Sequence, residues 1–245
     1  MITLAIPSYN RSYYVIESFI RVLSDNRINE ILIVDDNSGL EEFSTLEILI
    51  SELCHHKGHE KIRLIRNQNN LGSFLNKKEC VTNSKFDWVI LLDSDNVIDV
   101  QYLNSIENKR DATTIYTPSH AICDSPILNY RKYSNTSLTK NEYVRTVSEG
   151  NNVTWDCILN TGNYFFNKIN YLKCINQEPE VLESYAADAF YMIYLWMKNI
   201  PNAKLEVTEG MVYEHRLHSN SHWTMNSELS NSFVKNLTEK IIRWN

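Results

Sequence analysis

Short apolar runs alternate with helical patterns through the first half of the chain. Runs of about five apolar residues end in polar turns, and between them apolar positions recur at helical spacing. This alternation predicts stacked βαβ units and a mostly parallel sheet. The predicted strands are Ile2 to Ile6, Glu30 to Val34, Ile62 to Ile65 and Trp88 to Leu92. The predicted helices are Tyr14 to Leu23, Glu42 to Cys54 and Ser73 to Thr82.

The second half of the chain has a weaker periodicity. Residues from Asp111 to Asn152 mix turn formers, tyrosines and charges, which predicts loops around one strand, Thr113 to Thr117. The remaining pattern predicts a strand, a long helix, an extended segment and a final amphipathic helix that packs on the body or on a partner. These are Asn163 to Asn167, Ser184 to Lys198, Met211 to His215 and Asn226 to Arg243.

The composition is that of one folded domain. A chain of 245 residues with 43% hydrophobic residues can bury one substantial core. The net charge of -6 gives no basic field to attract nucleic acid or anionic lipid. The five cysteines form no C-x-x-C pair, which argues against a zinc ribbon or a disulfide framework and favours a reducing, cytoplasmic location. No window is long enough for a membrane span, and no signal peptide is expected.

Polar residues follow each of the four strands predicted in the first half. In open α/β sheets, ligands bind beyond the carboxyl ends of the strands, so these strand tips predict one candidate site. Asp93 and Asp95 follow a buried strand one residue apart, and two carboxylates on the same side suit Mg²⁺ or Mn²⁺. The competing interpretation is a polar turn that leads into a helix capped by Asp99.

The first two strand tips carry further candidates. The segment DDNS, residues 35–38, offers a carboxylate that could accept hydrogen bonds from a base N–H or a ribose hydroxyl, or could form an ordinary Asx turn. The segment PSYNR, residues 7–11, offers an aromatic platform and a cation. Its competing interpretation is a helix entry capped by Asn10 or Ser12.

These segments together resemble family 2 glycosyltransferases. AIPSYNR, ILIVDDNS, NNLGSFLNKKE and WVILLDSDN match the family in order and spacing over roughly the first hundred residues. The resemblance implies an inverting enzyme with the GT-A fold, a single α/β domain whose central, mostly parallel sheet is flanked by helices. The domain would span residues 1–225, with a nucleotide-binding half (1–110) and an acceptor-binding half (111–225). A C-terminal helix, 226–245, would follow.

The resemblance implies roles in donor binding for one set of residues. In this sequence they are Pro7, Tyr9, Arg11, Asp36, Lys77, Asp93 and Ser94. The first motif would border the nucleotide base and Asp36 would contact it, while Asp93 would touch the ribose. Lys77 falls where the family often has an arginine that contacts phosphate. Asp95 would bind Mn²⁺ or Mg²⁺, which neutralises the diphosphate leaving group.

The resemblance also places a general base on a later helix. Inversion needs a carboxylate that takes the proton of the acceptor hydroxyl, and Asp188 occupies the family's position for it. Ala187 stands where the family commonly has Glu, with Glu183 as a substitute. Gly162 and Asn163, in a segment that resembles the family's Gly-containing strand, would shape the acceptor side. The competing interpretation of Asp188 is an acid that complements a helix dipole.

A histidine-containing segment near the end supplies the last candidates. Many family members carry Arg and His in such a segment, and RLHSNS, residues 216–221, fits this form. His218 would therefore ligate the metal or touch the diphosphate, and His215 is the alternative ligand. Imidazole binds Mn²⁺ well enough to favour it over Mg²⁺. The competing interpretation is surface polarity.

The implied partners are a nucleoside diphosphate sugar and a hydroxyl acceptor. A UDP-sugar is the first candidate donor, with dTDP- and GDP-sugars open. The acceptor would be a glycan, a lipid-linked sugar or a small molecule, and a homodimer stays open. Two other functions compete. A nucleotidyltransferase would need a glycine-rich phosphate loop that residues 7–14 lack. An inactive sugar-nucleotide-binding protein is kept open by Ala187.

Overall fold

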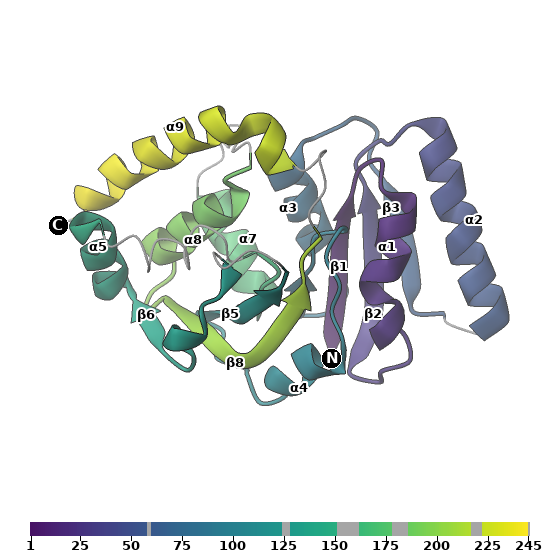
Figure 1. The fold of residues 1–245 in the computed structure, drawn as a ribbon, viewed down its shortest axis with the longest axis horizontal. Helices are drawn as coiled ribbons and strands as arrows, with labels where there is room; N and C mark the ends of the chain where they lie inside the picture. Colours follow the sequence, from purple (N-terminus) through teal and green to yellow (C-terminus); the bar gives the residue numbers. More distant parts are fainter. Residues whose placement is uncertain (58–59, 124–127, 151–161, 178–185, 217–221, 245) are drawn as a thin grey trace.

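The structure is a computed structural model that describes residues 1–57, 60–123, 128–150, 162–177, 186–216 and 222–244 (Figure 1). The strands are β1 (Ile2–Ser8), β2 (Ile28–Asp35), β3 (Ile62–Arg66), β4 (Trp88–Leu91), β5 (Thr114–Ile122), β6 (Ser137–Thr139), β7 (Phe165–Asn167) and β8 (Lys204–Glu214). The helices are α1 (Ser12–Phe19), α2 (Leu40–Lys57), α3 (Ser73–Asn83), α4 (Val100–Ser105), α5 (Lys140–Glu149), α7 (Lys168–Asn176), α8 (Asp188–Asn199) and α9 (His222–Ile242). Short 3₁₀ turns occur at Ile20–Val22 and Arg131–Tyr133.

The strands form one eight-stranded sheet in the order β3-β2-β1-β4-β7-β5-β8-β6. β1 pairs in parallel with both β2 and β4, and β2 pairs in parallel with β3. β7 runs antiparallel to its neighbours β4 and β5, and β6 runs antiparallel to β8. β5 and β8 are parallel. The sheet is therefore mostly parallel, as the alternation of strand and helix patterns predicts.

Successive residues of the central strands face opposite sides of the sheet, and both sides are apolar. In β1, Leu4 and Ile6 belong to the apolar cluster beneath α1, α2 and α4, while Ala5 belongs to the cluster beneath α3, α7 and α8. A strand that is covered on both faces needs apolar residues at every position, which is why these strands read as continuous apolar runs. The four strands predicted in the first half are confirmed as β1, β2, β3 and β4.

The prediction of loops around one strand from Asp111 to Asn152 is wrong at the end of that strand and from Ser137 onward. β5 continues to Ile122, and the helix α5 follows β6. Thr139 caps α5 in a capping box with Glu142, and Gly150 ends it in the left-handed conformation. The T-x-x-E spacing and the following glycine are helix signals. The buried Tyr143, Val144 and Val147 also recur at helical spacing, so the sequence carried a helix signal that the prediction did not use.

Other boundaries in the second half also differ from expectation. β8 begins at Lys204 rather than Met211, with Leu205 and Val207 alternating inward. The helix α7 follows β7 directly and is capped by the Asn167 side chain. α9 begins at His222, four residues before the expected start, and the residue at the expected start, Asn226, has non-helical backbone angles. No helix within the described residues combines the length and apolar content of a membrane crossing.

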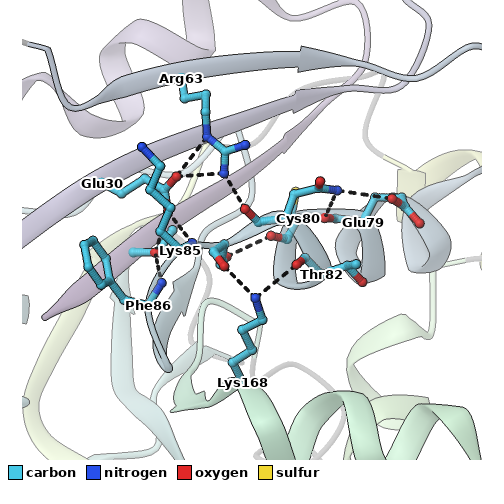
Figure 2. Close-up of polar contacts among 11 residues, drawn as sticks. Glu30, Arg63, Glu79, Cys80, Thr82, Lys85, Phe86 and Lys168 are labelled. Atoms are coloured by element: carbon cyan, nitrogen blue, oxygen red, sulfur yellow. Dashed lines mark hydrogen bonds and ion pairs between the residues drawn. The ribbon is translucent and has the colours of Figure 1, made fainter.

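A buried glutamate on β2 links β1, β3 and the loop before β4 (Figure 2). Glu30 is 1% exposed and accepts hydrogen bonds from Thr3 Oγ1 at 2.7 Å and from the Lys85 amide at 2.7 Å. Arg63 donates to it through Nε at 3.0 Å and Nη2 at 2.8 Å. Arg63 and Lys168 also donate to carbonyls at the C-terminal end of α3. A buried carboxylate is tolerated here because its lone pairs are occupied.

Replacing Glu30 by Gln is expected to lower the free energy of unfolding by about 2–4 kcal/mol, because it removes the charge that Arg63 neutralises and leaves buried donors unpaired. Urea unfolding followed by circular dichroism measures it. The matched control is Arg21→Gln, which breaks an exposed ion pair with Glu214 and should cost under about 1 kcal/mol. Equal unfolding midpoints for the two variants would show that the Glu30 network adds no stability.

Candidate active site

The carboxyl ends of the parallel strands lie side by side and are tied to one another by backbone hydrogen bonds. The Asp36 amide donates to the Ser8 carbonyl at 2.8 Å, the Asn67 amide to Asp35 at 2.8 Å, and the Leu92 amide to Ala5 at 2.9 Å. The polar residues after β1, β2, β3 and β4 therefore share one edge of the sheet, as expected. This edge is the candidate site.

The second strand tip is held together by a local turn and by the first tip. Asp35 accepts the Ser38 amide at 2.9 Å, so this acid serves the turn, while the candidate for ligand binding in the segment is Asp36. The Asn10 amide donates to Ser38 Oγ at 2.8 Å, and Asn10 Oδ1 accepts the Gly39 amide at 2.9 Å. Neither Asn10 nor Ser12 caps α1, whose N-cap residue Arg11 makes no capping bond. The alternative interpretation of this segment, a helix entry capped by Asn10 or Ser12, is therefore wrong.

Asp36 is buried and organises the turn after β3. Its Oδ1 accepts Asn67 Nδ2 at 2.8 Å and the Leu71 amide at 2.9 Å, and its Oδ2 accepts the Gly72 amide at 2.9 Å. Gly72 has a φ of 81°, a conformation that favours glycine. Asp36 therefore connects the glycine turn to the end of β2. Tyr9, after β1, is exposed.

Asp93, Lys77 and Asp188 form one charged cluster. Lys77 Nζ lies 2.6 Å from Asp93 Oδ1 and 2.5 Å from Asp188 Oδ2. Lys77 comes from α3 and Asp188 is the first residue of α8, 111 positions later. Asp95 is paired separately, with Arg11 Nη1 2.5 Å from its Oδ2. The fold therefore brings the acid pair, both cations and Asp188 into one site, and Asp99 caps α4 outside it.

Burial and mutual attraction set the protonation of this cluster. Burial lowers the pKa of the Lys77 ammonium, but Asp188 and Asp93 outweigh it, so that pKa stands well above its usual range. Burial raises the pKa of Asp93, but Lys77, Arg11 and His215 outweigh it and the pKa is lowered. Lys77 is therefore a cation and Asp93 an anion near neutral pH.

Gly162 and Asn163 lie against the acid pair. Asn163 Oδ1 accepts the Asp93 amide at 2.9 Å, and the Asn163 carbonyl accepts the Tyr102 hydroxyl at 2.7 Å. A Cβ at Gly162 would stand 3.2 Å from Asp93 Oδ2, which is closer than most side chains tolerate. Both residues are thus in contact with the turn that carries Asp93. Their expected role toward an acceptor stays a prediction.

The remaining candidates divide between the site and its surroundings. Ser94 is buried beside the acids and Pro7 is half-buried. His215 lies close enough to Asp93 to lower its pKa, while Arg216 turns away to pair with Glu17 at 2.6 Å. His218 and Glu183 lie outside the described residues. Within the described part of the chain, no group of three or more His, Cys, Asp or Glu side chains is arranged to hold a metal.

Sequence patterns missed two features of this site. The contact between Lys77 and Asp188 joins residues 111 positions apart, and local sequence patterns do not predict contacts over such a distance. The sequence also gives no sign that Asn67 and Asn163 support the acids by hydrogen bonds. Asn163 has a φ of 60°, a conformation that Asn adopts more readily than most residues.

Comparison with known proteins identifies the family. A family model described as Glycosyl transferase family 2 matches residues 3–175. No curated protein matches the sequence. Among solved structures, S. aureus TarS 1–349 in complex with UDP-GlcNAc has a TM-score of 0.65 at 13% identity and covers 98% of this chain and 70% of its own. The mannosyltransferase PcManGT from Pyrobaculum calidifontis, in complex with GDP-Man and Mn²⁺, has a TM-score of 0.66 at 11% identity, with coverages of 100% and 64%.

At such identities the structural likeness bears on the fold, and both structures belong to glycosyltransferases with the GT-A architecture seen here. The family match is of a different kind, because it rests on sequence and spans well over half of the 245 residues. The chain therefore belongs to glycosyl transferase family 2 and is a glycosyltransferase with the GT-A fold.

Proposed function

We propose that this enzyme transfers a sugar from a UDP-sugar to an acceptor hydroxyl, with inversion at the anomeric carbon and with a divalent cation. The observation that carries the proposal is the bridge from Asp93 through Lys77 to Asp188. It joins an acid on the donor side to a carboxylate from the opposite half of the domain, within one buried cluster. An inverting reaction needs a carboxylate at the donor site to take the acceptor proton, and this cluster supplies Asp188 for that role.

Asp188 is the proposed general base. It would accept the proton of the acceptor hydroxyl as that oxygen attacks the anomeric carbon and the nucleoside diphosphate leaves from the other face. Its carboxylate is held at the first turn of α8, a helix whose residues from Phe190 to Met197 are all buried and so fixed in place. The glutamate that is common in the family before this residue is replaced here by Ala187, which is buried.

Lys77 and the cation share the charge of the leaving diphosphate in this proposal. Lys77 would contact the phosphates as a point charge. Asp95, together with His215, which lies close to Asp93, would offer the oxygen and nitrogen ligands that suit Mn²⁺. His218 stays a candidate beyond the described residues. When bound, the metal neutralises the charge that develops on the diphosphate. Arg11 now pairs with Asp95 and would have to yield that carboxylate to the metal.

The surroundings of Asp36 favour uracil or thymine over guanine as the base of the donor. A carboxylate has about four acceptor sites, and Asp36 uses three of them within the protein. One site on Oδ2 is left, which matches the single N–H of a uracil or thymine imide. Guanine presents two adjacent donors and would leave one unpaired. Tyr9, 48% exposed, is available to stack on the base.

The other partners follow from the family. We propose a hydroxyl of a glycan, a lipid-linked sugar or a small molecule as the acceptor, and a cytoplasmic location in which the thiols stay reduced. Among the described cysteines, Cys80 and Cys174 are buried free thiols. A homodimer stays a prediction.

Donor binding tests the proposal directly. Calorimetric titration of UDP-, dTDP- and GDP-sugars with Mn²⁺, Mg²⁺ or EDTA should show metal-dependent binding, with UDP-sugars favoured over GDP-sugars by about ten-fold or more. Asp95→Ala should weaken the metal-dependent binding by about two orders of magnitude. Asp99→Asn, which keeps the cap of α4, is the matched control and should bind as the wild type does. If no sugar nucleotide binds under any metal condition, the proposal is wrong.

A further inference from the structure

The C-terminal helix α9 carries a buried hydroxyl that reaches the segment in front of Asp188. Ser230 is 0% exposed. Its Oγ accepts the Ala186 amide at 3.0 Å and donates to the Asn226 carbonyl at 2.8 Å. Asn226 is the residue at which α9 departs from helical geometry, with φ of −130° and ψ of 20°. Ser230 therefore ties the bend of α9 to the chain that enters α8.

The N-terminus of α8 has no side-chain cap of its own. Its N-cap residue, Ala187, makes no capping hydrogen bond, and the first helical bond runs from the Tyr191 amide to the Ala187 carbonyl at 2.9 Å. Ser230 instead holds the backbone just before the helix, because its hydroxyl accepts the amide of Ala186, two residues before Asp188. The position of Asp188 thus depends on a contact with a different helix.

Aromatic packing links α9 to the same pair of helices. Phe233 packs edge-on against Tyr191 of α8 with ring centroids 5.3 Å apart, and Tyr191 packs against Phe74 of α3 at 5.0 Å. Phe74 lies one turn before Lys77, on the same face of α3. α9 therefore packs on α8 and is linked to α3 through Tyr191, and it runs over α8 to α5 (Figure 1).

We propose that Ser230 is a positioning residue for Asp188, and that α9 is a part of the active site rather than an appendage to the catalytic domain. This inference rests on the proposed role of Asp188 as general base. Ser230 touches no reacting atom. It fixes the backbone from which the carboxylate extends, and a shift of that carboxylate by about 1 Å would impair proton transfer strongly.

Replacing Ser230 by Ala tests this. The expected result is a fall in kcat of about ten- to hundred-fold with an unchanged dissociation constant for the donor. Ser230→Thr keeps the hydroxyl and should recover most of the loss. Thr238→Ala is the matched control: its hydroxyl donates to Val234 at 2.8 Å, within α9 itself, so its loss should leave turnover unchanged. In a crystal structure of Ser230→Ala, the distance from Lys77 Nζ to Asp188 should exceed about 4 Å.

Several outcomes would overturn the inference. Wild-type kcat in Ser230→Ala, or a Thr variant as impaired as the Ala variant, would show that the hydroxyl does not position the base. A Ser230→Ala protein that no longer binds the donor would show that α9 supports the fold as a whole. Absence of transfer by the wild type with every donor would instead contradict the proposed function, and the crystallographic distance would still report on Ser230.

Discussion

Replacing Asp188 by Asn is expected to reduce kcat by about 10²–10⁴-fold while donor binding is retained, because an amide cannot take the proton of the acceptor hydroxyl. Lys77 would keep its contact with Asp93, so the cation that meets the diphosphate would stay in place. Stopped assays of sugar transfer give kcat, and calorimetric titration of the donor gives the dissociation constant. The two measurements together separate loss of the base from loss of binding.

The matched control for this variant is Glu142→Gln. Glu142, like Asp188, is an acid in the first turn of a helix, where a negative charge complements the helix dipole. If Asp188 serves only the dipole, both substitutions should cost a few tenths of a kcal/mol to about 1 kcal/mol of stability and neither should change turnover. Full activity in Asp188→Asn would assign the base to another residue, with Glu183 the first to examine.

The strands of the nucleotide-binding half could be predicted because each contains a run of consecutive apolar residues. Leu4, Ala5 and Ile6 are all fully buried, so the middle of this strand is a run of apolar residues. Helices such as α2 follow from their spacing and from the turns around them. The alternation of the two patterns then implies the parallel sheet, and with it the edge at which the polar strand tips meet.

The second half was harder to predict because its elements depend on contacts with distant parts of the chain. α5 buries Tyr143, Val144 and Val147 against elements far from it in sequence, and its other residues are polar. β8 alternates inward and outward only over Leu205 to Val207, and its partner β5 lies about ninety residues earlier, beyond the reach of a local pattern. The capping box at Thr139 was a local signal that periodicity did not include.

The acids of the site could be located from the sequence, but their partners could not. A strand followed by D-x-D marks a position on the sheet edge whatever lies opposite. That Lys77 would bridge Asp93 and Asp188 depends on the packing of α3 against β1 and β2 and on the place of α8 in the domain. Family resemblance gave Lys77 a role toward phosphate, and it carried no information about a contact with Asp188.

Replacing Lys77 by Met is expected to impair donor binding, turnover and stability together. The ammonium is the shared partner of two carboxylates, and its side chain is 13% exposed. Removing it leaves two like charges close together in a poorly solvated place, at a cost of about 3 kcal/mol. The pKa of Lys77 is raised and that of Asp93 is lowered, so this stabilisation is present between the ordinary ranges of a carboxyl and of lysine. It is lost as pH rises through the raised pKa of Lys77 or falls through the lowered pKa of Asp93.

The loss of donor affinity in Lys77→Met should be about ten- to hundred-fold, the contribution of one charge-assisted contact with phosphate. Asp188→Asn, by contrast, spares donor binding, so the pair of variants separates a residue that meets the donor from one that meets the acceptor. Lys78→Met, the next residue of α3, is the matched control and should leave all three properties near those of the wild type.

Lys77→Arg distinguishes charge from shape at this position. The guanidinium keeps the positive charge, so stability and donor affinity should largely return, since the family often carries arginine here. A planar fork cannot replace a point charge that lies within 2.6 Å of two carboxylate oxygens without moving them, so kcat should stay below that of the wild type. If Lys77→Met instead binds the donor as tightly as the wild type, Lys77 does not contact the diphosphate and serves only to hold the two acids.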